Sequence, residues 1–454
     1  MLFRSQYLTD GALPMAAVNR IREELTWVTV PESQKIEALL KLDRFGRHEF
    51  RRLVEMIREL IKGGNKESAT RLADHYLEVL KLGLSANPEE VSRLPELFSH
   101  MASVRGDFWE KSVDLLVDAL PRTGTGAGPM LSTQSLSGQD YRHWQVLNCM
   151  VALAKDVAPY EEFGLIEKLG EAMERLATQD AANHEACCRI TLSTLLTPSA
   201  IERLIEISVQ RGDDVAWAKT AAPLLRWSGA AAISKLFQQL ESEQVEANRG
   251  VLIRLIGRLG PGALDLARQQ LADEHWYVVR NACRLLVELK DPDLVQQLAP
   301  VLRHPDERAQ KAAAKAIRES RHPAHGLIFA EALPFLHPSV AEKVLDELLY
   351  LRDPATVPAL ERFILRDPRG KTGPLMMAVQ ALAVIPGEHV EQTLGAILSD
   401  STFETVIRRV AMIALARSST PRSAEFLREW LQAAPQDPMA QETGSTLRAL
   451  GRAV

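Results

Sequence analysis

The sequence is poor in aromatic residues, which make up 6% of its 454 residues. Hydrophobic residues make up 46%, and alanine and leucine dominate among them. Small aliphatic side chains suit closely stacked helices better than the sandwiches and barrels of all-β proteins. The composition therefore predicts a soluble, all-α protein.

The sequence also lacks a large excess of positive or negative residues. The chain has 54 Lys and Arg against 59 Asp and Glu, which gives a formal net charge of −5. A protein that binds nucleic-acid phosphates normally has a basic excess. The charge balance therefore argues against a nucleic-acid partner, although it leaves room for a local basic stripe.

Cysteine is scarce, and the four cysteines lack the paired spacing of a disulfide framework. Reduced thiols of this kind are typical of a cytosolic protein. His184 and Cys188 lie one helical turn apart, which is metal-ligand spacing, but no second CxxC or HxxxH lies nearby. We therefore interpret Cys187 and Cys188 as buried thiols in a helix seam, and we expect no metal and no cofactor.

Long hydrophobic runs are absent as well. The longest uncharged apolar run, residues 372–387, is too short to span a bilayer and contains Pro374 and Pro386. The beginning of the sequence does not resemble a signal peptide, because charged residues interrupt residues 20–24. We expect no membrane span and a cytoplasmic location.

What the sequence does contain is a repeat. Apolar residues such as Val279, Ala282, Cys283, Leu286 and Leu289 form a helical stripe that ends at a turn, and a second stripe follows. The turn residues recur at spacings of 31, 32, 31, 31, 31, 32 and 35; they are Pro198, Gly229, Pro261, Pro292, Pro323, Pro354, Pro386 and Pro421. Such a period predicts a solenoid, in which each helical hairpin buries its apolar face only by stacking on its neighbours.

One segment of the repeat carries a family resemblance. The run Asp-Glu-His-Trp-Tyr-Val-Val-Arg-Asn-Ala at residues 273–282 resembles the repeat opening of HEAT proteins, specifically the short bacterial class first described in phycobilisome lyases. Partial matches occur at residues 306–313 and 400–411. The resemblance covers roughly residues 180–435 and implies a bacterial protein with an α-α superhelix, a HEAT-like solenoid of stacked helical hairpins. It implies little about function.

The pattern divides the chain into five segments. Residues 1–14 form an N-terminal tail whose start resembles a translated adapter scar, and residues 15–120 form either a separate helical domain or degenerate repeats. Residues 121–140 are rich in glycine and serine and are interpreted as a linker or a loop. Residues 141–435 form the HEAT-like solenoid, and residues 436–454 hold a C-terminal capping helix.

One column of basic residues stands out in the repeats. Arg249, Arg280 and Lys311 each lie twelve residues before a turn residue, until Glu342 breaks the row. Equal offsets stack on one face of a solenoid, so the three cations form a short ladder. The ladder is either a site for an anion or an acidic partner, or the structural arrangement of HEAT repeats, in which the basic residue ties to a loop acid such as Asp273.

The sequence offers no catalytic motif, since no Ser-His-Asp set, HExxH or nucleophile elbow can be recognised. We therefore expect a non-enzymatic scaffold or adaptor that binds another protein, within a signalling or assembly complex, through the concave face lined by the second helices. The candidate partner-binding residues on that face are Gln296, Gln297, Glu361 and Arg362. Two alternatives remain, a nucleic-acid-binding HEAT-like protein of the DNA-repair type and a lyase-type chromophore helper.

Overall fold

The computed structural model describes residues 24–83, 88–101, 104, 107–120, 138–418 and 420–450. Every regular element in these ranges is a helix, which confirms the predicted all-α class. The predicted tail at residues 1–14 and residues 121–137 of the predicted linker lie outside the described residues. The chain divides into unit 1, residues 1–235, and unit 2, residues 236–454.

Unit 1 is built from helices of very different lengths. They are α2 (Glu32–Leu40), α3 (Arg47–Lys62), α4 (Lys66–Gly83), α5 (Leu94–Met101), α6 (Asp107–Ala119), α7 (Gly138–Val157), α8 (Phe163–Gln179), α9 (Ala181–Leu192), α10 (Pro198–Arg211) and α11 (Val215–Trp227). In the chain, α12 (Ala230–Ser242) follows them. α7 packs against α6, α8 and α9, and α8 packs against α9 and α11. The core of this unit is therefore shared by helices that are not consecutive.

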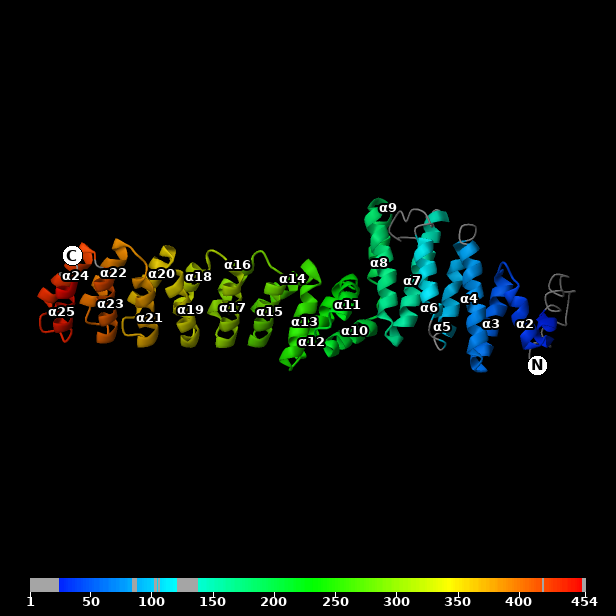
Figure 1. The fold of residues 1–454 in the computed structure, drawn as a ribbon, viewed down its shortest axis with the longest axis horizontal. Helices are drawn as coiled ribbons and strands as arrows, with labels where there is room; N and C mark the ends of the chain where they lie inside the picture. The colour runs from blue at the N-terminus through cyan, green and yellow to red at the C-terminus, as the bar shows by residue number, and fades with distance from the viewer. Residues whose placement is uncertain are drawn as a thin grey trace, which may run out of the picture. The chain divides into compact units, whose positions relative to one another are not determined.

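Unit 2 alternates longer first helices with second helices that are mostly shorter. The first helices are α13 (Glu246–Gly257), α15 (Trp276–Glu288), α17 (Glu307–Ser320), α19 (Pro338–Leu351), α21 (Thr372–Ala383), α23 (Thr405–Ser418) and α25 (Ala440–Leu450). The second helices are α14 (Leu264–Gln269), α16 (Leu294–Leu298), α18 (His325–Ala332), α20 (Val357–Arg366), α22 (Glu388–Ser399) and α24 (Pro421–Ala433). Figure 1 shows the two sets as two separate rows.

The junctions between first and second helices follow the turn residues of the sequence. Lys290, Arg321 and Arg352 have positive φ angles of 54°, 52° and 50° at successive junctions, each two residues before a turn proline. A left-handed residue ends a helix by turning the chain away from its axis. The repeated turn chemistry confirms the predicted helix–turn–helix unit.

The predicted apolar stripe is the core of unit 2. Val279, Ala282, Cys283 and Leu286 of α15 are fully buried, whereas Leu289, just past the helix end, is half-buried. α15 packs between α13 and α17, and α19 packs between α17 and α21. Each hairpin thus buries its apolar face against its neighbours, as a solenoid requires. No helix in the described part of the chain is long and apolar enough to cross a membrane.

Candidate functional site

The second helices of unit 2 carry a groove around an exposed aromatic ring, which we call the Phe335 groove. Its volume is about 410 Å³, and its lining residues are Arg303, Ala330, Glu331, Pro334, Phe335, Ala359, Arg362 and Arg366. They come from three consecutive second-helix segments, namely η6 (Ala299–Arg303), α18 with η7 (Leu333–Phe335), and α20. The groove therefore forms only where consecutive repeats stack.

Phe335 is held at the surface by its backbone. Leu333, two residues earlier, is only 2% exposed, whereas Phe335 is 46% exposed. The carbonyl of Phe335 accepts a hydrogen bond of 3.1 Å from Nε2 of Gln310, a buried side chain of α17. This bond fixes the short 3₁₀ turn in a position that leaves the ring exposed. Full burial of a phenylalanine side chain would stabilise the fold by roughly 1.5–3 kcal/mol, and this contribution is not made in full here.

Three arginines line the groove, and one of them contacts the ring. The guanidinium of Arg303 lies over the Phe335 ring at 4.5 Å from its centroid. Arg362 Nε donates to a carbonyl of its own helix, that of Pro358, at 3.2 Å. Among the described residues, no ion pair joins a carboxylate to Arg303, Arg362 or Arg366. Glu331 is the single acidic residue among those that line the groove, so the groove has a positive excess.

The central residues of the groove form a column in register. Arg303, Phe335 and Arg366 each end a second-helix segment and are 32 and 31 residues apart. Equal offsets in a repeat bring side chains onto one face. This periodicity is the signal in the sequence that locates the groove, but only counting from the ends of the second helices reveals it.

The predicted partner-binding residues lie in different environments. Arg362 lines the Phe335 groove, whereas Gln296, Gln297 and Glu361 are not among its lining residues. Gln296 is exposed and Gln297 half-buried on α16. Glu361 accepts hydrogen bonds from His389 Nε2 and Thr393 Oγ1, so it ties α20 to α22. This contact joins consecutive second helices, and partner binding by Glu361 stays a prediction.

The predicted basic ladder lies on the first helices and is largely engaged. Arg249 Nη1 donates to the backbone carbonyls of Glu243 and Gln244 at 3.2 and 2.7 Å. Lys311 forms an ion pair with Glu307, one turn away on α17. Arg280 donates to Asn281 Oδ1 at 3.1 Å. The three cations therefore have different partners. Arg249 binds backbone carbonyls, Lys311 binds a carboxylate, and Arg280 binds a side-chain amide.

The Trp276 ring contacts Arg280 and a second arginine. The guanidinium groups of Arg280 and Arg308 lie 5.0 and 3.7 Å from the Trp276 ring. Burial and the nearby charge of Arg249 lower the pKa of Arg280. Asp273, the loop acid considered for this column, instead accepts from the backbone N–H and Nδ1 of His275 at 2.7 and 3.0 Å.

The tie between repeats that the HEAT resemblance implies occurs further along the chain. Arg408 of α23 is 7% exposed, and its Nη2 donates to Asp437 Oδ2 at 2.7 Å. Its Nε donates to the carbonyl of Leu398 at 2.9 Å. One buried guanidinium thus joins α23 to the end of α22 and to the loop before α25.

Stacked helical hairpins joined by a recurring turn define the class of the α-solenoids. A family model of HEAT repeats matches residues 233–318 and 264–338. Residues 233–338 are therefore similar to HEAT repeats. The match names HEAT repeats in general, and the narrower resemblance to the phycobilisome-lyase class stays a prediction. No curated protein matches the sequence.

Solved structures resemble the chain at low scores. Human deoxyhypusine hydroxylase is 21% identical over 55% of this chain and 95% of its own, with a TM-score of 0.23. A chain from a homology model of the AP-3 complex is 12% identical over 93% and 88%, with a TM-score of 0.38. A chain of Kap121p is 14% identical over 98% and 54%, with a TM-score of 0.22. The assignment to a class therefore rests on the hairpins and on the family match.

Proposed function

We propose that this chain is a non-enzymatic protein-interaction scaffold and that the Phe335 groove binds an acidic segment of a partner protein. The observation that carries the proposal is a half-exposed phenylalanine held among three arginines that form no ion pair in the described residues. Aromatic and arginine side chains supply much of the binding energy at protein interfaces.

The form of the groove supports a peptide-like ligand. Its lining combines apolar surface from Pro334, Phe335 and two alanines with the side chains of three arginines. Arginine binds carboxylates through two parallel hydrogen bonds, which favours Asp and Glu side chains. We therefore expect the partner segment to carry acidic residues next to an apolar or aromatic anchor.

A nucleic acid is the less favoured ligand. The arginines of the groove are accompanied by Glu331, and the whole chain has a net charge of −5. A site that follows a phosphate backbone would require a longer continuous basic surface. Binding of single-stranded oligonucleotides with a steep dependence on salt would contradict the proposal.

The experiment is selection of peptides from a random display library by the full chain, followed by measurement of Kd for the enriched sequence. Phe335→Ala and Arg366→Glu are expected to weaken binding roughly 10-fold or more, as loss of an interface hot spot does. Tyr350→Ala and Arg284→Glu are matched controls, because both residues are exposed on first helices. Equal loss in the controls and in the groove variants would refute the assignment of the site.

A further inference from the structure

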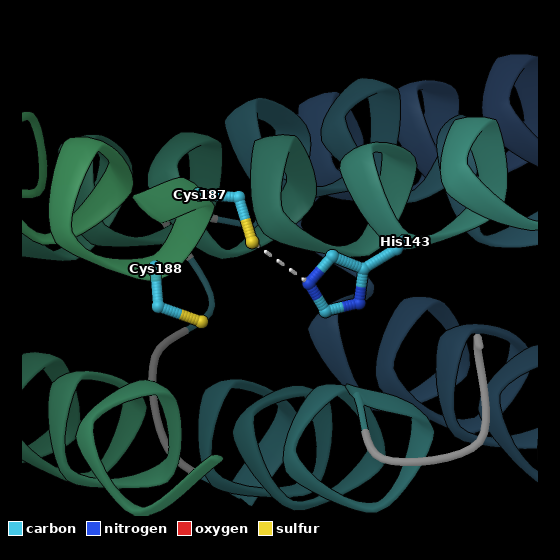
Figure 2. Close-up of side chains that lie close together, drawn as sticks. All are labelled: His143, Cys187 and Cys188. Atoms are coloured by element: carbon cyan, nitrogen blue, oxygen red, sulfur yellow. Dashed lines mark hydrogen bonds between the residues drawn. The ribbon is translucent and has the colours of Figure 1, made fainter. Parts of the chain in front are cut away.

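Unit 1 contains a buried cluster of metal-ligating side chains that the sequence spacing does not reveal. His143 comes from α7, and Cys187 and Cys188 come from α9 (Figure 2). One ligand atom from each lies within 4.8 Å of the others, and all three residues are buried. Figure 2 shows the His143 ring and the Cys187 sulfur directed toward each other. The cluster thus joins two helices that are separated in the chain by α8.

The distances fit a tetrahedral thiolate and imidazole site. With Zn–S bonds of about 2.3 Å and Zn–N bonds of about 2.0–2.1 Å, neighbouring ligand atoms lie about 3.6 Å apart for S and N and about 3.8 Å apart for two sulfurs. Cys187 Sγ and His143 Nε2 are 3.5 Å apart. Cys188 Sγ lies within 4.8 Å of both atoms, so the three donors gather around one position.

A second histidine lies against the cluster. The His184 ring lies beside that of His143, with centroids 4.7 Å apart and the ring planes tilted by 43°. His184 is 6% exposed, and its Nδ1 is buried without a hydrogen-bond partner in the described residues. Its other nitrogen, Nε2, faces Asp180 Oδ2 at 3.7 Å. His184 therefore places a buried imidazole with an unpartnered nitrogen next to the cluster, where it can support a bound ion.

The remaining cysteines provide a contrast within the same chain. Cys149 is also buried, but its thiol donates to the carbonyl of Val91 at 3.1 Å. Cys283 is a fully buried member of the apolar stripe of α15. Neither belongs to a group of ligating side chains in the part of the chain that the structure describes. A buried thiol alone therefore does not produce the arrangement of Cys187 and Cys188.

We propose that His143, Cys187 and Cys188 bind a zinc-class metal ion and that His184, whose ring lies beside that of His143, supports the site. Soft thiolates together with imidazole select zinc over calcium or magnesium, which prefer oxygen ligands. Binding releases the protons of the two thiols and fastens α9 to α7. Because all three ligating residues are buried and come from two helices, we assign the ion a structural role.

The direct test uses Co²⁺ as a spectroscopic substitute in the reduced full chain. We expect one Co²⁺ per chain, with the intense visible bands of a tetrahedral site and a thiolate-to-cobalt band in the near ultraviolet. Zn²⁺ should displace Co²⁺ and raise the Tm. Absence of the tetrahedral and thiolate bands in the wild-type chain would overturn the proposal without reference to any variant.

Variants assign the ligands. Cys187→Ser, Cys188→Ser and His143→Ala are expected to abolish the bands, and His184→Ala to weaken Co²⁺ binding roughly 10–100-fold, as loss of a supporting contact does. Cys283→Ser and Cys149→Ser are the matched controls and should keep full binding. Circular dichroism checks that each variant folds. Retention of the bands in Cys188→Ser, or their loss in Cys283→Ser, would contradict the assignment.

Discussion

Unit 2 is built from first helices of similar length, such as α13 with 12 residues and α17 with 14, whereas α4 and α7 of unit 1 run for 18 and 20. Uniform hairpins keep the ends of the second helices in register, so that Arg303, Phe335 and Arg366 form a surface column. Helices of unequal length bring unrelated positions together in the interior, as with His143 and Cys187. In this chain the regular repeats thus carry a column of surface residues, and the irregular helices carry a buried cluster.

The largest expected effect comes from breaking the link that keeps unit 2 in register. Gln310 is 3% exposed and bonds to three backbone groups, donating to the carbonyls of His304 and Phe335 and accepting from the N–H of His337. Gln310→Ala leaves these groups without their partner and should destabilise unit 2 by roughly 2–4 kcal/mol.

Urea unfolding monitored by hydrogen exchange of α17 and α19 measures the effect of Gln310→Ala. Gln297→Ala is the control, since this half-buried side chain lies on α16 away from the link; we expect a change under about 0.5 kcal/mol. Equal stability of the two variants would show that the repeats do not depend on Gln310 for their register.

A second pair of substitutions compares close helix packing in the two units. A Cβ at Gly170 of α8 would overlap the buried Trp227 indole, whereas a Cβ at Gly395 of α22 would lie 2.8 Å from Phe426 Cδ1. Gly170→Ala should cost about 1–3 kcal/mol. Gly395→Ala should cost less, because the half-buried Phe426 ring has room to turn. Thermal melts measure the loss of stability in both variants. A larger loss in Gly395→Ala than in Gly170→Ala would mean that the helices of unit 1 adjust more easily to an added methyl group.

The smallest expected effect concerns a turn of unit 2 and its pH dependence. Burial acts to raise the pKa of Asp291, but hydrogen bonds from Arg268 and from the N–H of Asp293 outweigh it and lower the pKa. The Asp291 carboxylate therefore stabilises the fold above its ordinary pKa of about 3.9, and this contribution is lost as the pH falls through the lower folded value.

Asp291→Asn should cost about 1 kcal/mol at pH 7. The difference in Tm from the wild type should shrink as the pH falls below about 4. The exposed Asp293, which also pairs with Arg268 at 3.0 Å, provides Asp293→Asn as a milder control. A difference in Tm that stays constant from pH 7 to pH 3 would exclude the ion pair as its cause.

The sequence predicts the hairpins of unit 2 well because their signals are local. Turn prolines such as Pro292 and stripe residues such as Val279 act within one hairpin, and both occupy the predicted places. The candidate sites are harder to predict. Phe335 is exposed because a side chain 25 residues earlier holds its carbonyl, and His143 meets Cys187 across 44 residues that follow no period.

The central claim is that the Phe335 groove binds an acidic segment of a partner protein. Hydrogen exchange of the full chain, with and without the selected acidic peptide, tests it most directly. The account predicts slower exchange in η7 and α20, with no change in α13 and α15. Protection confined to α13 and α15, where Arg249 and Arg280 lie, would contradict it and transfer the binding site to the first helices.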